Sequence, residues 1–538
     1  MEILLIMPRY ISSSKTTKPN YNYSFPTGLS YIYSVIKNAG YNIDTYNLNH
    51  EDGKVEDLVK TKLDNKKYDI VGVGGMAIDY QVIEKIINVS KEHQSKPLVI
   101  LGGAIITSNR EIVSKNINFD IGVIGEGEVT IIELLKKIEK KENFKEVKGI
   151  CYKEGEKIIF TLPREQIVDL DTIPFPGYEA FGFGKVLDNQ DSLGLFFGLM
   201  DHPRAYPLLG SRGCPFQCTF CHHSIGSKYR KRSVDNIIQE IEFAINTYKI
   251  NSFVLNDDLF SADKERLNDF CKKIKKLDEK YSIKLSWWCS LWVGTVDEKM
   301  LNTLKDAGCF YVGFGFESYS KKVLQSMKKP ITPEQIDNAI KLCMKVNMPV
   351  VGNFIFGDVE ETKETAEETL NYWKENCKGQ VKLFFIHPYP GSEIYKSCLD
   401  RGIIKDELNF IKNEIHHTYI RNMTKNMSEE EFEKLKKEIY ELTRTSIPYK
   451  VPFKVKKESG KKYSIFVNCP YCKKETVLKN SLIQNKKYFS SQIICRECKM
   501  KYNVCSRLYK FTMDNYVQLD FLRKNYLIYR DKFLRSRL

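Results

Sequence analysis

The chain has 538 residues, of which 42% are hydrophobic and 28% are charged. This composition is typical of a globular protein, and the length predicts three or four domains. No run of about 18 apolar residues occurs, so no transmembrane helix is expected. Fifteen cysteines in metal-like spacings, with no basic region at the N-terminus, predict a cytoplasmic protein in a reducing compartment.

The net charge of +15 is unevenly placed. From Lys454 to the C-terminus there are 21 Lys and Arg residues against 6 Asp and Glu, and the charges before that point cancel. Such a basic segment suits an anionic partner, either nucleic acid or another acidic surface. A lysine-rich solvated surface is the alternative, and both interpretations stay open at this point.

Residues 1–140 alternate short apolar runs with helical patterns. The apolar runs, at 3–7, 43–46, 70–73, 98–101 and 121–124, are short and β-branched and predict strands. Helical patterns lie between them at 29–39, 80–91 and 129–140. This alternation predicts a doubly wound parallel sheet of the flavodoxin or Rossmann type, with a ligand at the carboxyl ends of the strands.

Glycines concentrate at these predicted strand ends, where they let a ligand approach the backbone closely. Three of these stretches resemble parts of a cobalamin-binding domain. They are the helix opening Pro26-Thr27-Gly28-Leu29, the pair Gly102-Gly103 and the run Gly125-Glu126-Gly127-Glu128. The resemblance implies that cobalamin contacts Thr27, Gly28, Leu29, Gly74, Gly75, Gly102, Gly103, Gly125, Glu126 and Gly127. A cofactor-free domain of the same fold is the alternative.

One signature of several cobalamin enzymes, the cobalt-ligating histidine of a D-x-H-x-x-G motif, is absent. His50 begins an H-x-x-G sequence, but Leu48 stands in the aspartate position and the motif follows the second predicted strand instead of the first. We therefore interpret His50 as a loop histidine. The lower face of cobalt would be met by another residue, by water or by nothing.

Residues 141–205 are predicted to form a hairpin and a linker. The runs 149–152 and 157–160 flank Glu154-Gly155-Glu156, which favours a hairpin, and two prolines follow near residue 175. The lone Cys151 is expected to be a packing residue.

Three cysteines, Cys214, Cys218 and Cys221, stand in a C-x-x-x-C-x-x-C spacing on one short stretch. Three thiols cannot pair off as disulfides, and thiolates favour zinc or iron–sulfur centres. Three ligands without an obvious fourth suit a cubane cluster with one open iron. A zinc site that borrows His222 or His223 is the alternative.

The spacing, with Phe220 just before the third cysteine, resembles the cluster loop of the radical S-adenosylmethionine (SAM) superfamily. The resemblance implies that the three cysteines hold a 4Fe-4S cluster whose fourth iron is chelated by SAM. It further implies reductive cleavage of SAM to a 5′-deoxyadenosyl radical, with a flavodoxin or ferredoxin as the reductant.

Residues 206–420 show a second alternation of strands and helices, which predicts a partial (β/α)6 TIM-like barrel with function at the strand ends. Polar and glycine-rich stretches follow several of these strands. By the same resemblance, the SAM-binding residues would be Phe220, Asp257, Asp258, Glu317, Ser318, Gly352 and Gly357. Helix capping or a turn is the alternative role of the Asp and Ser residues.

The remaining chain is divided into a helical connector, 421–453, and a basic module, 454–538. The connector contains a helix at 428–443 that opens with a capping box, Ser428 and Glu431. The module carries two C-x-x-C knuckles, Cys469/Cys472 and Cys495/Cys498, separated by 22 residues, which predict a zinc ribbon with a structural Zn²⁺. A second iron–sulfur cluster that includes Cys505 is the alternative.

Taken together, the sequence resembles a cobalamin-binding radical SAM enzyme with a zinc-ribbon-like extension, and methyl transfer to an unactivated carbon is the function that this implies. A radical SAM methylthiotransferase acting on RNA is a second hypothesis, although only Cys151 precedes the cluster loop. A non-catalytic cobalamin-binding sensor is a third, and it leaves the three cysteines unexplained. The substrate does not follow from the sequence.

Overall fold

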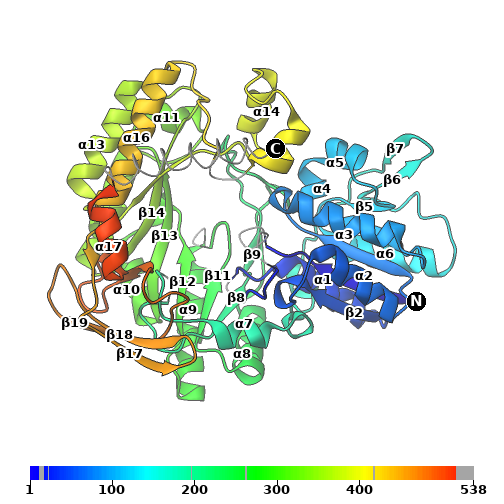
Figure 1. Cartoon of the computed structure of the whole chain (residues 1–538), viewed down its shortest axis with the longest axis horizontal. Helices are drawn as coiled ribbons and strands as arrows, with labels where there is room; N and C mark the ends of the chain where they lie inside the picture. Colours follow the sequence, from blue (N-terminus) through cyan, green and yellow to red (C-terminus); the bar gives the residue numbers. More distant parts are fainter. Residues whose placement is uncertain (11–16, 22, 196, 261–262, 416–418, 517–538) are drawn as a thin grey trace, which may run out of the picture.

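The computed structural model describes residues 1–10, 17–21, 23–195, 197–260, 263–415 and 419–516. In Figure 1 an N-terminal α/β part, in blue and cyan, lies beside a larger α/β part in green and yellow. The orange strands of the C-terminal module lie against the larger part, away from the N-terminal one. None of the described helices is long and apolar enough to cross a membrane.

The N-terminal part is built on a seven-stranded sheet with the order β2-β1-β3-β4-β5-β6-β7. Strands β1 to β5 are parallel, as predicted, and β1 and β3 are almost entirely buried because helices cover both faces of the sheet. The strands are β1 (Glu2–Met7), β2 (Asn42–Asn47), β3 (Ile70–Gly74), β4 (Leu98–Gly102), β5 (Ile121–Val123), β6 (Ile150–Glu154) and β7 (Lys157–Phe160).

The helices of this part divide between the two faces of the sheet. One face is covered by α1 (Thr27–Asn38) and α6 (Gly127–Glu139), which share a core with Ile3 and Ile100. The other face is covered by α2 (Val55–Asn65), α3 (Tyr80–Glu92) and α4 (Ala104–Ser108), and α5 (Arg110–Asn116) follows α4. This is the doubly wound arrangement that the sequence predicts.

The hairpin β6–β7 corrects one predicted boundary. The predicted hairpin is present, but we placed it in a separate region of hairpin and linker, 141–205, whereas β6 pairs antiparallel with β5 and extends the N-terminal sheet. The edge of β5 would otherwise expose unpaired backbone groups, and the hairpin satisfies them. Cys151 of β6 is fully buried in the core, consistent with a packing residue.

The larger part is built on a six-stranded parallel sheet in which the strands follow chain order, β8-β11-β12-β13-β14-β15. The strands are β8 (Ala205–Leu208), β11 (Ser252–Leu255), β12 (Ser286–Ser290), β13 (Cys309–Glu317), β14 (Val350–Phe356) and β15 (Lys382–Phe385). Between them lie α8 (Val234–Tyr248), α9 (Lys264–Tyr281), α10 (Glu298–Asp306), α12 (Pro333–Lys345) and α13 (Lys363–Asn376).

These helices cover one face of the six-stranded sheet, and the opposite face is called the inner face below. On β14 every second residue is buried in the core shared with the helices, and the alternate residues are only half-buried. The same alternation occurs on β12 and β15. Because side chains alternate along a strand, the half-buried set lies on the inner face.

The C-terminal module follows α16 (Glu429–Thr445), whose predicted capping box between Ser428 and Glu431 is present. The module has a small core of its own. It contains two three-stranded sheets, one of β17 (Lys454–Ser459), β18 (Lys462–Asn468) and β19 (Glu475–Leu482), the other of β16 (Tyr449–Lys450), β21 (Lys501–Cys505) and β20 (Ser490–Ile494), and it ends with α17 (Arg507–Asp514). Most of the predicted basic tail, 517–538, lies outside the described residues.

Candidate functional site

The loop with Cys214, Cys218 and Cys221 follows β9 (Ser211–Arg212), beyond the carboxyl end of β8. Gly213 opens the loop with a φ of 79°, and a side chain there would collide with the carbonyl oxygen of Lys228. Glycine is therefore required at this turn. Further along the loop, the Thr219 amide donates to the Met327 carbonyl at 3.0 Å, which holds the loop against the segment after β13.

The three thiols of this loop are free, with Cys214 and Cys218 half-buried and Cys221 exposed. Burial raises the pKa of Cys214 and of Cys218, so a metal must displace their protons. Among the described residues, these thiols form no group that converges to within 4.8 Å with each other or with a histidine. A single zinc ion needs such convergence, whereas a cubane cluster holds each thiolate on a different iron. The donor set fits a 4Fe-4S cluster.

The neighbouring carboxylates Asp257 and Asp258 have different environments. Asp257 is buried, and its oxygens accept from the Gly210 amide and the Ser211 hydroxyl, both at 2.6 Å. Burial raises the pKa of Asp257 to about 6, although these two hydrogen bonds oppose the shift. Asp258 is exposed on the side of the cysteine loop, and its charge acts on the thiols of Cys214 and Cys221. Of the two, Asp258 is placed to meet a bound molecule.

Glu317 ends β13 in the left-handed backbone region, with a φ of 63°. Its carboxylate accepts from Lys329 Nζ at 2.9 Å, and both side chains are largely shielded from water. Burial would lower the pKa of Lys329, but the charge and hydrogen bond of Glu317 outweigh it and raise that pKa. The thiols of Cys218 and Cys221 also act on Lys329, so this ion pair borders the cysteine loop.

Ser318 has its hydroxyl in use within the protein. Its Oγ lies 3.1 Å from Thr369 Oγ1 and accepts from the Ser320 amide, also at 3.1 Å. At the end of β14, Gly357 has a φ of 98° and its amide donates to the buried Glu361 carboxylate at 2.5 Å. Gly352, on the same strand, is crowded by the ring of Phe316. These contacts support the strand ends that were predicted to hold SAM.

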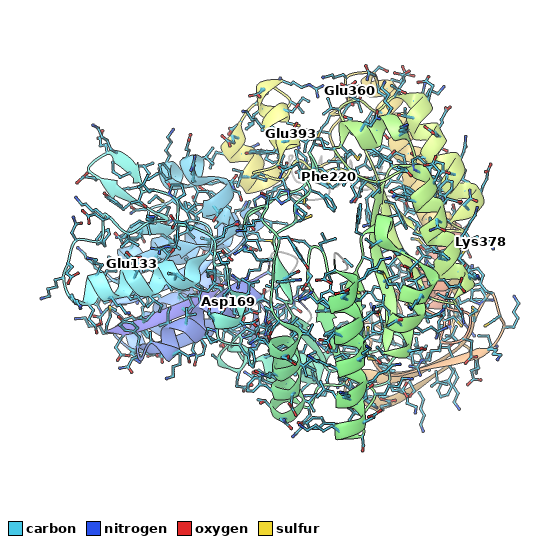
Figure 2. The ribbon with its side chains drawn as sticks, turned by 180° about the vertical axis from the view of Figure 1, so that it is seen from behind. Glu133, Asp169, Phe220, Glu360, Lys378 and Glu393 are labelled. Atoms are coloured by element: carbon cyan, nitrogen blue, oxygen red, sulfur yellow. The ribbon has the colours of Figure 1, made fainter. Side chains whose placement is uncertain are left out.

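Phe220 is half-buried next to the third cysteine and packs at the edge of the core that contains Ile386 and Ile394. In Figure 2 it lies beneath Glu393, the first residue of α14 (Glu393–Asp400), beside the strands of the second sheet. The amide of Ile394 donates to the Thr219 carbonyl at 2.9 Å, so α14 fixes this side of the loop.

A cavity of about 510 Å³ opens at the carboxyl ends of the N-terminal strands. All ten residues that were predicted to contact cobalamin line it: Thr27, Gly28, Leu29, Gly74, Gly75, Gly102, Gly103, Gly125, Glu126 and Gly127. Side chains added at Gly28, Gly102 or Gly125 would meet no atom within 4 Å, so the backbone there borders open space. Apolar side chains of the sheet and of α1 and α6 line its deeper part.

This cavity is shared between the two sheets. Besides the N-terminal residues, it is lined by Arg212, Ser224, Ile225 and Asn256 from the second part of the chain. Ser224 and Ile225 come directly after the cysteine loop, and Asn256 precedes Asp257. A molecule in the cavity would therefore lie next to both the loop and the strand end at Asp257.

His50 does not line the cavity. It ends a short helix, Leu48–His50, where its Nε2 lies 3.0 Å from the Tyr23 hydroxyl. Burial lowers the pKa of His50 to about 4, so the ring is neutral. Its surroundings are those of a structural histidine, as we expected.

Buried ion pairs join the two sheets beside the cavity. Arg212 reaches Glu126 at 2.8 Å and Glu128 at 2.7 Å, and Arg230 reaches Glu126 at 2.6 Å. Glu126 also accepts from the Ile167 amide at 2.9 Å. Both oxygens of Glu126 are thus held by the protein, and this residue locks the N-terminal part to the cysteine-loop side.

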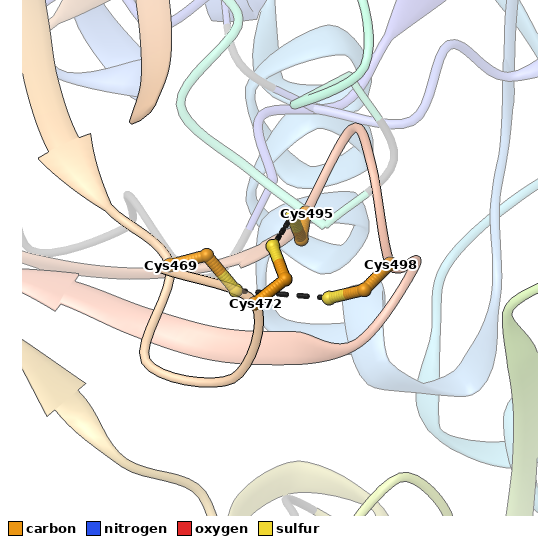
Figure 3. A group of neighbouring side chains, drawn as sticks. All are labelled: Cys469, Cys472, Cys495 and Cys498. Atoms are coloured by element: carbon orange, nitrogen blue, oxygen red, sulfur yellow. Dashed lines mark hydrogen bonds between the residues drawn. The ribbon is translucent and has the colours of Figure 1, made fainter. Parts of the chain in front are cut away.

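A second set of thiols lies in the C-terminal module. The ligand atoms of Cys469, Cys472, Cys495 and Cys498 all lie within 4.8 Å of one another, and Figure 3 shows the two knuckles facing each other. The Cys469–Cys498 and Cys472–Cys495 sulfur pairs are each 3.7 Å apart. Four thiolates around one tetrahedral ion have this spacing, so the set fits Zn²⁺. Cys505, at the end of β21, is not a member of this group.

Several charged residues of the site were not singled out from the sequence. Lys329 and Arg212 have no motif around them and become visible only through their partners Glu317 and Glu126. A single lysine or arginine between two predicted elements cannot be identified as a site residue from the sequence.

Comparisons with known proteins agree with this geometry. A family profile described as "Radical SAM superfamily" matches residues 208–372, and one described as "B12 binding domain" matches residues 20–135. The first contains the cysteine loop and the strand ends of the second sheet. The second contains most of the residues that line the cavity in the N-terminal part.

Curated relatives match most of the chain. The uncharacterized methyltransferase PH0819 of Pyrococcus horikoshii is 30% identical over 415 residues, which are 75% of this chain and 84% of that protein. An anaerobic magnesium-protoporphyrin IX monomethyl ester cyclase of Cereibacter sphaeroides is 25% identical over 421 residues, 76% of this chain and 66% of that protein. Among solved structures, TsrM of Kitasatospora setae, with cobalamin and a [4Fe-4S] cluster, has a TM-score of 0.60 at 16% identity and covers 75% of this chain and 76% of its own. That likeness shows a shared fold.

Proposed function

The chain belongs to the radical SAM proteins that carry a B12-binding domain, and from this membership we propose that it is a cobalamin-dependent methyltransferase acting on an unactivated carbon. The observation that carries the proposal is the shared cavity, because one space is bordered by the glycine-rich strand ends, by Ser224 and Ile225 after the cysteine loop, and by Asn256. A relative named as a methyltransferase supports the reaction type.

The cofactors are assigned to residues that fit them. Cys214, Cys218 and Cys221 would hold the 4Fe-4S cluster, with Phe220, Asp258, Glu317 and the strand from Gly352 to Gly357 around SAM. The cavity glycines with Thr27 and Leu29 would hold cobalamin. When bound, the cluster supplies reducing chemistry towards SAM and cobalamin supplies methyl-transfer chemistry.

The protein itself contributes by holding the groups of the site in fixed positions. Lys329 holds the Glu317 carboxylate at 2.9 Å, which fixes one acceptor beside the cysteine loop. Asp257 accepts from the Gly210 amide and from the Ser211 hydroxyl and so holds the segment just before that loop. The buried Arg212 and Glu126 pair keeps the cavity and the loop in one fixed relation. Exact placement of this kind lets two cofactors and a substrate meet without water.

For the C-terminal module, we propose a structural zinc ion on Cys469, Cys472, Cys495 and Cys498. Four thiolates complete a tetrahedral shell and leave no open position for a substrate. The lysines of β17 are largely exposed, and an anionic partner at this surface stays a prediction. A small electron-carrier protein such as flavodoxin or ferredoxin is proposed as the reductant, since Cys221 lies at the surface.

The experiment is anaerobic purification, reconstitution with iron and sulfide, and supply of cobalamin, followed by incubation with SAM and a reductant. We expect about four irons on the cysteine loop, bound corrinoid, and SAM-derived 5′-deoxyadenosine. A Cys218→Ala variant should lose the iron and the SAM cleavage together. A reconstituted wild type that binds iron and corrinoid but leaves SAM intact would contradict the proposal.

A further inference from the structure

A lysine without a partner lies on the inner face of the six-stranded sheet. Lys382, the first residue of β15, has no carboxylate within 4.0 Å and no hydrogen-bond acceptor among the residues that the structure describes. Its neighbours on the strand, Leu383 and Phe385, are buried in the core shared with the helices. Lys382 therefore points the other way, to the inner face.

The ammonium group of Lys382 lies near an aromatic ring of the same strand. Its Nζ lies 6.0 Å from the ring centroid of Phe384, which is two residues further on and on the same face. The Phe384 side chain is 46% exposed, so this part of the inner face is open. Lys382 therefore borders an accessible part of the inner face.

Polar side chains without partners continue across the inner face. Asn353 of β14 is the register partner of Lys382, and Ser290, the last residue of β12, lies on the same face, level with Val351 two residues before Asn353. Within the described residues, neither side chain hydrogen-bonds to the protein. Between them β13 presents Gly313 and Gly315, and the side chains of Glu317 and Lys329 lie above Gly315.

The C-terminal module closes this face from below. Lys501 of β21 is buried, and its Nζ donates to the carbonyl of Val350, the first residue of β14, at 2.7 Å. Ile494 of β20 shares a small core with Tyr311, whose ring stacks on Trp288 at 5.1 Å. Burial and, to a smaller extent, the charge of Lys382 together lower the pKa of Lys501 to about 7, so the two lysines are electrostatically close.

The Glu317 carboxylate near this region is already neutralised. Its oxygens lie over Gly315, where the carboxylate pairs with Lys329. Among the described residues, Lys382, two strands away, has no such partner. An anionic group would gain little at the neutral pair on β13 and would be attracted at β15, which gives a bound molecule one orientation.

Resting on the proposed function, we propose that the inner face is the substrate site and that it binds an anionic group, a carboxylate or a phosphate. Lys382 pairs with the anion, the Asn353 amide donates a hydrogen bond to it, and Ser290 contacts the substrate nearer the floor. A half-buried cation without a counter-ion is costly, and a bound anion removes that cost while gaining charge-assisted hydrogen bonds. Lys501 and Ile494 form the floor of the site.

The test uses the full chain, reconstituted with iron, sulfide and cobalamin, in calorimetric titrations with inorganic pyrophosphate and with glutarate at one fixed salt concentration. Lys382→Met should weaken binding of the preferred probe at least tenfold, and Lys382→Arg should restore it to within about threefold. Tighter binding of pyrophosphate would indicate that the site takes a phosphate group, and tighter binding of glutarate would indicate a carboxylate. The matched control is Lys378→Met, an exposed lysine four residues earlier (Figure 2), which should leave binding unchanged.

Three results would overturn the inference: wild type that binds neither probe in the millimolar range, Lys382→Met that binds like wild type, or an equal loss in Lys378→Met. If Lys382→Met lost SAM affinity as strongly as probe affinity, Lys382 would be assigned to SAM binding, and this result would also overturn the inference. Iron content, corrinoid content and SAM cleavage of the wild type are measured on the same samples. Their failure would count against the proposed function, whereas retained probe binding in Lys382→Met counts against the anion site alone.

Discussion

Arg212 Nη1 lies 2.8 Å from the carboxylate of Glu126, and this ion pair joins the cysteine-loop side of the second sheet to the N-terminal sheet. Arg230 shares the same carboxylate at 2.6 Å. All three side chains are at most 7% exposed, so the charges are paired away from water. The relation between the cavity and the cysteine loop depends on this cluster.

Substitution Glu126→Gln should destabilise the junction of the two sheets. It removes one negative charge from between two buried guanidinium groups, and breaking a buried pair costs about 3 kcal/mol or more. We expect a thermal midpoint several degrees lower and faster proteolysis between the two sheets. The control Glu438→Gln removes an exposed partner of Lys374 and should change the midpoint by no more than about a degree. Equal effects of the two variants would contradict this role of Glu126.

Substitution Gly28→Val should impair cobalamin binding without weakening the fold. Gly28 is the second residue of α1 and borders the cavity, with no atom within 4 Å of an added Cβ. Gly184, the second residue of α7 (Phe183–Asn189), also has free space but does not line the cavity. Corrinoid affinity, measured by absorbance, should fall about tenfold or more in Gly28→Val and stay unchanged in Gly184→Val. Normal corrinoid uptake by Gly28→Val would move cobalamin away from this cavity.

The two sets of cysteines should bind different metals independently. Cys218→Ser is expected to lose iron and keep zinc, while Cys472→Ser is expected to lose zinc and keep iron, because the thiols lie on separate parts of the chain. Cys505→Ser should change neither metal content. Metal analysis of the three anaerobically purified variants decides the matter. About eight irons in the wild type without zinc, with loss in Cys505→Ser, would instead indicate a second cluster in the C-terminal module.

Glu361 should make the fold sensitive to pH near neutrality. Burial raises the pKa of this carboxyl to about 8, while the unfolded value is near 4.5. The unfolded state releases its proton first, so the stability that neutral Glu361 contributes is present below pH 4.5 and is lost as the pH rises through 8. The free energy of unfolding of wild type should therefore fall relative to that of Glu361→Gln between pH 5.5 and 8, by up to about 1.4 kcal/mol per pH unit, and the thermal midpoint should fall with it. For the half-buried neighbour, Glu360→Gln should differ from wild type by an amount that does not change with pH, and the same constancy for Glu361→Gln would refute the assignment.

At Lys501 the dependence of stability on pH should have the opposite sign to that at Glu361. Its folded pKa of about 7 lies below the unfolded value of 10.5, so the unfolded chain binds more protons between these values. Wild-type stability should therefore rise relative to Lys501→Met as the pH increases from 7 to about 9.5. Thermal midpoints of the two proteins, with the exposed Lys457→Met as control, measure this difference. A difference that does not vary with pH would show that Lys501 is not buried at the base of β14.

The predicted architecture holds where local patterns are strong. The parallel strands of residues 1–140 are confirmed because short β-branched runs alternate with amphipathic helices, and this pattern has few other solutions. The capping box of α16 is confirmed for the same local reason, since Ser428 and Glu431 are three residues apart. The hairpin β6–β7 was predicted at the right residues but was not assigned to the N-terminal sheet, because its partner β5 lies across a loop and pairing between strands is not a local property.

For the site, sequence spacing identified the residues whose chemistry is fixed by their neighbours in the chain. The loop of Cys214, Cys218 and Cys221 and the knuckles of Cys469 and Cys495 carry their thiols within a few residues, so the sequence alone predicted both ligand sets, and the structure brings the four thiols of the second set together. Family membership likewise follows from these motifs and from the glycine-rich strand ends.

The tertiary structure decided how charges that are distant in the sequence are used. It separated the buried Asp257 from the exposed Asp258, joined Glu126 to Arg212, and placed Lys501 of the C-terminal module beneath the strand that pairs with Lys382. The physical reason is that burial and pairing depend on atoms brought together from residues 46 or more positions apart. Spacing along the chain can specify a ligand set, but only packing determines which charge is neutralised and which is left unpaired.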